Sequence, residues 1–265
     1  MKESRTTCHA SMDTRGVVTL TLDRPEKHNA FSSVMVDELH ELLGWAAGQV
    51  NVRALVLRAE GKHFSAGADL GNMRTMANAD QQENLDDAVR LARMLQRLDT
   101  FPRPSLAVVQ GAAFGGAVGL CCCCDTVIVG SQGRFCLSEA RLGLAASVVS
   151  PYVVRVLGPH HARHAALTAE TIDADKAIHY GLAQELTDDL EASVSRWTRA
   201  VLAGAPGAQA SIKDLVQRVH GLPVTDDLIQ ETAQLIADLR ALPEGREGLA
   251  AFFENRPPNW AQPEE

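Results

Sequence analysis

The chain has 265 residues, of which 46% are apolar and 22% charged, a composition typical of a globular protein with a sizeable core. Its formal net charge of -8 argues against a general affinity for phosphate backbones or anionic membranes. We therefore expect neither nucleic acid nor membrane as a partner. No apolar signal segment follows the polar N-terminus, Met1 to Arg5, so the expected location is the cytoplasm.

The first part of the chain repeats a strand, a turn and a helix. Alternating apolar residues predict a strand over 16–22 that ends at the turn Asp23-Arg24-Pro25. Ser32 or Ser33 can then cap a helix, because apolar residues recur behind them at helical spacing. Further strands are predicted from short apolar runs at 54–57, 105–109 and 126–129. This alternation predicts an α/β core over residues 1–190.

The last part of the chain contains helical patterns only. They cover 191–202, 208–219 and 225–242, and no apolar run of strand length follows them. A helical region over residues 191–265 that carries apolar residues without a sheet of its own is expected to pack on the core or on a neighbouring subunit.

Six cysteines are present, and four of them are consecutive, Cys121 to Cys124. Successive side chains on a helix point about 100° apart, so four in a row do not converge on one metal ion. Free cysteine packs as a small apolar residue. We expect these residues to fill a buried helix and no metal site to be present.

Two loops at strand ends carry the chemistry that the sequence suggests. They cover 61–69 and 110–119 and consist largely of small residues. Such loops let a ligand approach the backbone, and a helix that begins there offers unpaired N–H groups. Side by side, they would provide two donors for an oxyanion on a carbonyl. Taken singly, either loop is also compatible with a simple turn or a phosphate cradle, although the spacing fits neither the dinucleotide nor the Walker A pattern.

Five segments in register resemble the crotonase family, the enoyl-CoA hydratase/isomerase superfamily. They are Arg24-Pro-Glu-Lys-His-Asn-Ala30, Phe64-Ser-Ala-Gly-Ala-Asp69, Gln110-Gly-x-x-x-Gly-Gly116, Phe135-Cys-Leu-Ser-Glu139 with Gly143, and Glu247-Gly-x-x-Ala-Phe252. The resemblance implies an α/β fold, the crotonase (ClpP-like) spiral of repeated ββα turns with a C-terminal helical trimerisation region. It also implies a homo-oligomer, a trimer or a dimer of trimers.

The resemblance assigns roles to residues in these segments. The oxyanion donors fall on the N–H groups of Ala68 and Gly116, and the backbone of Ala66 would meet the adenine of coenzyme A. Lys27 and His28 would border the nucleotide. Coenzyme A is expected as part of the thioester substrate, with no tightly bound cofactor. Besides Ala66, Lys27 and His28, the residues expected to contact coenzyme A are Lys62, Asp69, Phe252 and Arg256.

One departure from the family concerns the phosphates. A lysine of the neighbouring subunit often meets them, and Asn255 stands at that position here. Arg256 or Lys62 would take over its role.

A second departure concerns acid/base chemistry. Hydratases of the family use two glutamates, and Glu139 matches the second of them. The first falls on Gly119, which has no side chain to move a proton. We therefore expect Glu139 to be the sole general acid/base, with a pKa tuned by burial.

A narrower resemblance suggests the substrate. The stretches 114–120 and 138–154 are similar to bacterial hydratases of 3-methylglutaconyl-CoA and isohexenylglutaconyl-CoA. This implies a hydro-lyase (lyase) that hydrates a β-branched glutaconyl-CoA in leucine or acyclic terpene degradation. The second carboxylate of such a substrate needs a partner, because burying it unpaired is costly. The candidates are Arg74, Arg141 and Tyr152.

Other functions remain compatible with the sequence. An enoyl-CoA isomerase or decarboxylase on the same fold also needs only one carboxylate beside an oxyanion hole. Some members of the family resemble RNA-binding proteins, which the acidic balance of this chain disfavours. A non-catalytic acyl-CoA-binding protein is the least favoured alternative, because both donors and Glu139 are intact.

Overall fold

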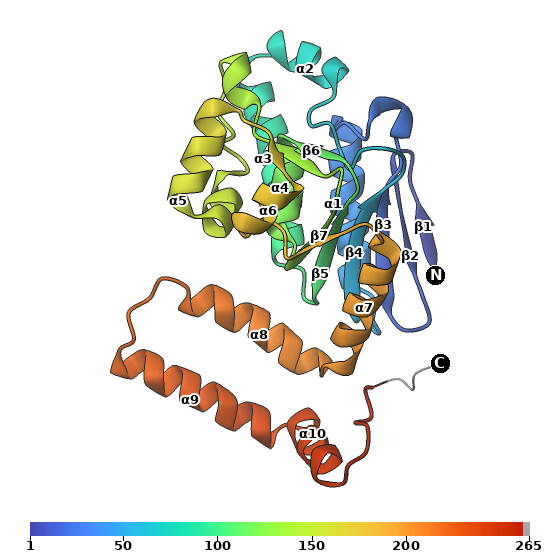
Figure 1. Cartoon of the computed structure of the whole chain (residues 1–265), viewed down its shortest axis with the longest axis vertical. Helices are drawn as coiled ribbons and strands as arrows, with labels where there is room; N and C mark the ends of the chain where they lie inside the picture. Colours follow the sequence, from blue (N-terminus) through green and yellow to red (C-terminus); the bar gives the residue numbers. More distant parts are fainter. Residues whose placement is uncertain (262–265) are drawn as a thin grey trace.

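The computed structural model describes residues 1–261 and contains two sheets (Figure 1). The larger sheet has seven strands in the spatial order β1-β2-β3-β4-β5-β7-β10. The first three pair antiparallel, and the rest pair parallel. Their bounds are β1 (Lys2–Ser4), β2 (Cys8–Met12), β3 (Val17–Leu22), β4 (Ala54–Ala59), β5 (Ser105–Val109), β7 (Thr126–Gly130) and β10 (Glu185–Thr187).

The smaller sheet makes the chain a spiral. It consists of β6 (Ala112–Phe114), β8 (Arg134–Cys136) and β9 (Ile172–Asp173). β5 is followed directly by β6, and β7 by β8, so each turn places one strand in the large sheet and the next in the small one. After β4, the chain forms no full strand beside the small sheet. Only a single parallel bridge, between Ser65 and Ala113, takes the place of that strand. This arrangement confirms the predicted α/β fold of ββα turns.

Within residues 1–261, ten α-helices surround and extend the sheets. They are α1 (Ser33–Ala47), α2 (Leu70–Ala77), α3 (Gln81–Asp99), α4 (Gly116–Cys123), α5 (Ser150–Thr168), α6 (Ala174–His179), α7 (Leu190–Ala203), α8 (Pro206–Val219), α9 (Asp226–Ala241) and α10 (Pro243–Phe253). Two short 3-10 turns, η1 (Pro25–Lys27) and η2 (Glu139–Leu142), flank the loops discussed below.

Both faces of the large sheet are covered, which explains why its strands read as continuous apolar runs. In β4, Leu55 and Leu57 point into the main core beneath α1, α3 and α4, whereas Ala54 and Val56 point to the opposite face. There they pack with Leu202 of α7. The period of two along the strand thus assigns alternate residues to two separate cores.

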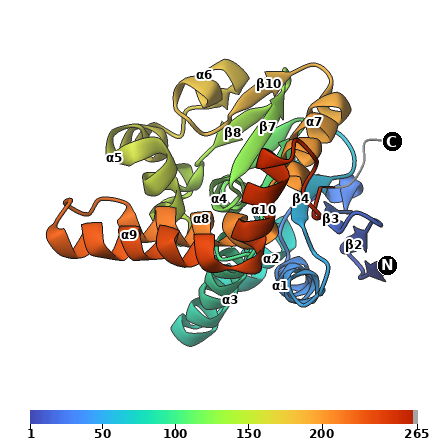
Figure 2. The ribbon, with the colours of Figure 1, turned by 90° about the horizontal axis from the view of Figure 1, so that it is seen from below.

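The three C-terminal helices α8, α9 and α10 lie below the sheets in Figure 1 and in front of them in Figure 2, which is seen from below. Lys213 of α8 joins them to the core by pairing with Asp125 at 2.6 Å. Arg218 of α8 pairs with Glu231 of α9, and Glu244 of α10 accepts N–H groups from the first turn of α8. Apolar side chains such as Ile212, Ile236 and Phe252 stay exposed on these helices. The strandless C-terminal region is as predicted over the described part of the chain, while its last four residues, 262–265, lie outside it. Trimerisation stays a prediction.

Ser32, one of the two residues predicted to cap this helix, caps α1, because its hydroxyl accepts the Met35 N–H at 3.2 Å. Other elements differ from the prediction, since the local sequence patterns did not indicate the strands β1 and β2, the strands of the small sheet or α10. In addition, α7 packs on the large sheet, so the predicted division near residue 190 separates α7 from the core it covers. No helix within residues 1–261 has the length and apolarity needed to cross a bilayer.

Candidate active site

The two glycine-bearing loops are bonded directly to each other. Ser65 N–H donates to the Ala112 carbonyl at 2.9 Å, and Phe114 N–H donates to the Ser65 carbonyl at 3.0 Å. Gly67 has a φ of +92°, and a Cβ added there would lie 3.1 Å from the Phe114 carbonyl oxygen. Only glycine combines this left-handed backbone with so close an approach. These hydrogen bonds therefore fix the position of the loop that contains Ala68 relative to the loop that contains Gly116.

The first predicted donor, Ala68, has an N–H that its neighbours leave free. Phe31 N–H donates to Gly67 O at 2.7 Å, and Asp69 N–H donates to Phe31 O at 2.8 Å. These two bonds form a parallel bridge between Phe31 and Ala68. In such a bridge, the N–H of the central residue points away from the partner strand. No acceptor within residues 1–261 takes the Ala68 N–H.

The second predicted donor, Gly116, is the first residue of α4, where an N–H has no partner inside the helix. The N-cap residue is Gly115, which has no side chain to satisfy this group. Gly115 also has a φ of +54°, and a Cβ there would lie 3.3 Å from Oε1 of Glu139. A glycine at this position thus leaves the helix N-terminus uncapped and lets a carboxylate approach it.

Glu139 begins η2 and lies against this helix N-terminus. Its Oε2 atom is buried and has no hydrogen-bond partner among the described residues. Burial raises the pKa of its carboxyl above the ordinary value, because removal from water disfavours the charged form. An unpaired, half-buried carboxyl of this kind is suited to exchange protons with a ligand.

One pocket of about 210 Å³ brings Ala68, Gly116 and Glu139 together. Most of its other walls are apolar, and its polar members are serines, Asn72 and Asp87. Asp87 is paired with Arg90 at 3.2 Å. The remaining lining residues are Phe31, Ser32, Ser33, Val36, Leu91, Ala145, Ala146, Ser147, Val148 and Val149. The three residues predicted for catalysis thus share one cavity.

Gly119 lies on α4, and a neighbouring side chain occupies the space where its own side chain would begin. A Cβ built on Gly119 would lie 2.5 Å from Cγ1 and 3.0 Å from Cβ of Val149. Val149 is itself buried and lines the catalytic pocket. The space in which a second glutamate would begin is therefore occupied by a valine, a relation that the sequence motifs alone do not reveal. The signal available was that Val149 falls in the segment 138–154, which departs from ordinary hydratases.

We expect Gly119→Glu to destabilise the fold, because the new side chain overlaps Val149 and places a carboxyl in a packed interior. Overpacking alone costs about 1–3 kcal/mol. The double variant with Val149→Ala should recover part of this loss, since the 2.5 Å contact disappears with the valine methyls. Thermal unfolding of the two single variants and the double variant gives the coupling between the positions.

The matched control combines Gly119→Glu with Val153→Ala, another buried valine one turn further along α5. A deletion there leaves the contact to position 119 untouched. Equal recovery by both valine deletions would contradict a specific Gly119–Val149 contact.

The residues predicted to border the nucleotide lie beside the Ala68 loop. Ala66 N–H donates to the His28 carbonyl at 2.9 Å, so the segment containing Lys27 is joined to the loop. Lys62, on the same loop, is exposed, as are Lys27 and His28. None of these residues lines the catalytic pocket. The structure therefore brings this predicted group together at the edge of the site, and its role in binding stays a prediction.

Asp69 has a structural role that accounts for its carboxylate. Oδ1 accepts the N–H groups of Gly71 and Asn72 and caps α2, and Oδ2 lies 3.4 Å from Nη2 of Arg24. An acidic N-cap of this type typically contributes about 1 kcal/mol to helix stability. These partners favour a role in fixing the loop over direct contact with a ligand.

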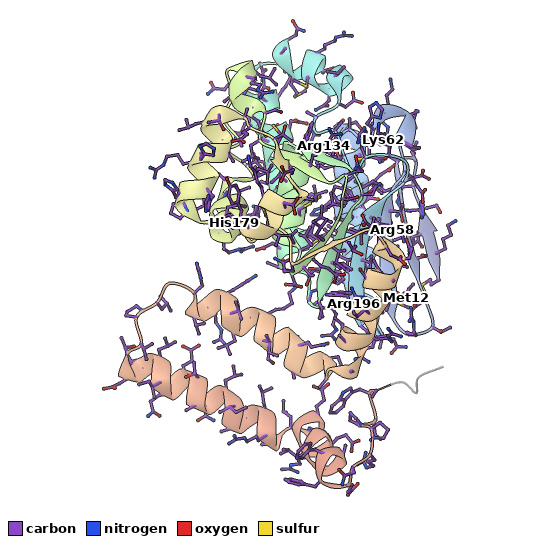
Figure 3. The ribbon with its side chains drawn as sticks, in the orientation of Figure 1. Met12, Arg58, Lys62, Arg134, His179 and Arg196 are labelled. Carbon is purple, nitrogen blue, oxygen red and sulfur yellow. The ribbon has the colours of Figure 1, made fainter. Side chains whose placement is uncertain are left out.

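Phe252 and Arg256 lie far in space from the pocket of the same chain. Both belong to α10 or the segment after it, at the end of the molecule opposite Lys62 (Figure 3). The guanidinium of Arg256 pairs with Glu247 at 2.6 Å and with Glu254. Within a single chain they do not complete the site, so a contact with coenzyme A would require a neighbouring subunit.

None of the three candidate partners for a second substrate carboxylate lines the catalytic pocket. Arg141 donates to the Ala169 carbonyl at 2.7 Å, and Tyr152 faces Arg155 at 5.6 Å from its ring centre. Arg74 lies in the last turn of α2. The sequence prediction thus missed the other polar pocket residues, which come from α1 and its N-cap, α2, α3 and the loop before α5 and share no motif.

Comparison with known proteins identifies the family. The pattern of the enoyl-CoA hydratase/isomerase family matches residues 13–263. A putative enoyl-CoA hydratase of Thermus thermophilus is 31% identical, over 92% of this chain and 97% of its own. The 2,3-dehydroadipyl-CoA hydratase of Escherichia coli is 30% identical, over 92% of this chain and 94% of its own.

A solved structure shows the same fold. The enoyl-CoA hydratase of Shewanella pealeana is 42% identical and superimposes with a TM-score of 0.94, over 96% of each chain. Together with the family match across both sheets and the C-terminal helices, this likeness extends over the whole architecture described above. The chain therefore belongs to the enoyl-CoA hydratase/isomerase family and is a hydro-lyase of the enoyl-CoA hydratase type.

Proposed function

We propose that the enzyme hydrates the α,β-double bond of a β-branched glutaconyl-CoA, 3-methylglutaconyl-CoA or isohexenylglutaconyl-CoA, in leucine or acyclic terpene degradation. The observation that carries the reaction is the shared pocket of Glu139, Ala68 and Gly116. The thioester oxygen lies between the two N–H groups, which stabilise the enolate formed when water adds to Cβ.

Glu139 serves as the only acid/base in this proposal. Its carboxylate takes a proton from the water that attacks Cβ, and the resulting carboxylic acid gives a proton to Cα on the same face. Gly119 offers no side chain for a second proton transfer, and Val149 fills the space beside it. Asp87 lies in the same pocket, but its carboxylate is paired with Arg90 at 3.2 Å, whereas Oε2 of Glu139 has no partner in the described chain.

The composition of the pocket walls favours a branched acyl group as substrate. An apolar surface of alanine and valine side chains around Val149 suits a hydrocarbon branch better than a second water-binding carboxylate. The related hydratase named for 2,3-dehydroadipyl-CoA acts, by that name, on an enoyl thioester that carries a second carboxylate. A dicarboxylic acyl group is therefore compatible with the family.

The pH dependence should reflect the raised pKa of Glu139. Attack by water requires the ionised carboxylate, so kcat/KM should fall as the pH decreases through the pKa of Glu139. Because burial raises this pKa, the acidic limb should lie above the range of an exposed glutamate. The measurement is a pH profile of kcat/KM with substrates that have no group ionising in the pH range of the acidic limb. An acidic limb at or below the ordinary glutamate range would contradict the assigned role.

Incubation with a panel of enoyl-CoA thioesters tests the function, with products resolved by mass. The panel contains crotonyl-CoA, 3-methylglutaconyl-CoA and isohexenylglutaconyl-CoA. Addition of one water to a branched glutaconyl thioester, with a higher kcat/KM than for crotonyl-CoA, is the expected result. An unchanged mass with a shifted double bond would indicate isomerisation, and loss of carbon dioxide would indicate decarboxylation. A preference for crotonyl-CoA would overturn the proposed substrate.

A further inference from the structure

A second cavity adjoins the catalytic pocket. It has a volume of about 280 Å³ and lies between Leu137, which follows β8, the loop after η2 and the two halves of α5. Ala146 lines both cavities. The two cavities therefore meet at Ala146, and we call the second one the distal cavity.

The distal cavity exists because α5 is interrupted. Gly158 has φ 71° and ψ 161°, a non-helical conformation, and Pro159 follows it. Proline has no N–H to continue the helical hydrogen bonds, so the second half of α5 starts in a new direction. Pro159, Ala162, Arg163 and Ala166 of that half form one wall, opposite Leu137 and Val153.

The two cavities differ in charge. The catalytic pocket is lined by two carboxylates, Asp87 and Glu139, and by no lysine or arginine. The distal cavity is lined by one cation, Arg163, whose other neighbours there are apolar apart from Ser150. Within residues 1–261, no ion pair involves the Arg163 guanidinium. The Arg163 side chain is exposed at the mouth of this cavity, so its guanidinium is free to bind an anion that enters from the cavity.

We propose that Arg163 determines specificity by binding the second carboxylate of the substrate in the distal cavity. This inference rests on the proposed function for its substrate class. A carboxylate held in the catalytic pocket would be repelled by Asp87 and Glu139, whereas one placed beyond Ala146 meets an unpaired guanidinium. Arginine also offers two parallel N–H donors that match the two oxygens of a carboxylate.

The test uses substrate pairs that differ only in the carboxylate. They are 3-methylglutaconyl-CoA with 3-methylcrotonyl-CoA, and 2,3-dehydroadipyl-CoA with 2-hexenoyl-CoA. Arg163→Gln should raise KM for the carboxylated member of each pair by about fivefold to tenfold, between the upper value for an exposed ion pair and the lower value for a charged hydrogen bond. Values of kcat should change little, because the contact is the same in ground and transition states. The uncharged members should stay within about twofold.

Two further variants serve as controls. Arg163→Lys keeps the charge and loses the paired donors, so it should restore part of the affinity. Arg199→Gln removes an exposed arginine of α7, on the other face of the large sheet, and should leave all four substrates unchanged. An equal loss for charged and uncharged substrates, or no loss at all in Arg163→Gln, would overturn the assignment.

The outcomes separate this inference from the proposed function. If the wild-type enzyme hydrates no branched glutaconyl-CoA but prefers 2,3-dehydroadipyl-CoA to 2-hexenoyl-CoA in an Arg163-dependent way, the proposed substrate fails and the carboxylate site stands. If branched glutaconyl-CoA is hydrated equally well by Arg163→Gln, the proposed function stands and the carboxylate site fails.

Discussion

Replacement of Glu139 by glutamine is expected to lower kcat by about 10²- to 10⁴-fold, the usual contribution of a general acid/base. Glutamine keeps the size of the side chain and its place against the N-terminus of α4 but accepts no proton. Position 119 offers no second carboxyl, since Gly119 has no side chain and Val149 fills the adjoining space. The loss should appear in kcat rather than in KM, because the proton is moved only during the reaction.

Two controls distinguish chemistry from folding in this variant. Asp87→Asn alters the other carboxylate of the same pocket, and we expect a much smaller effect because Asp87 lies paired with Arg90. Thermal unfolding should show Glu139→Gln to be at least as stable as the wild type near neutral pH. The raised pKa of Glu139 means that its contribution to stability is present when it is protonated at low pH and is lost as the pH rises through that pKa. Near-normal turnover of Glu139→Gln would disprove the proposed mechanism.

The architecture was predictable to the extent that it depends on local patterns. The apolar runs of β4, β5 and β7 are continuous because both faces of the sheet are covered, and this made them visible in the sequence. The small sheet was missed because β6 and β8 have three residues each and β9 has two. Segments of that length have no periodicity to detect, and their pairing depends on the spiral as a whole.

The grouping of the residues proposed for catalysis was predictable for a different reason. Ala68, Gly116 and Glu139 fall in segments whose order and spacing match a family, and the structure places all three in one pocket. The pocket wall was not predictable, because Asp87 and Leu91 of α3 and Val149 reach it only through tertiary packing. The contact between position 119 and Val149 shows this clearly. The sequence indicates that a glutamate is missing, whereas the structure shows that there is no space for one.

Replacement of Gly116 by proline is expected to lower kcat by about 10²- to 10³-fold, because it removes one of the two donors to the enolate oxygen. The backbone can accept the change, since Gly116 is the first residue of α4 and proline is well tolerated at that position. Its N–H makes no hydrogen bond within the described chain, so no structural bond is lost.

The control for this variant is Gly116→Ala. A Cβ at this position lies 3.1 Å from two ring carbons of Phe31, so alanine reproduces the contact of the new Cβ with Phe31 while keeping the N–H. The difference in kcat between the proline and alanine variants therefore measures the replacement of the N–H by the proline Cδ. Both should unfold at similar temperatures, and both should still bind a saturated acyl-CoA, which forms no enolate. Equal kcat values in two folded variants would show that Gly116 is not a donor. A large difference that appears only in the reaction, and not in binding of the saturated thioester, is the result expected of a group that stabilises the transition state.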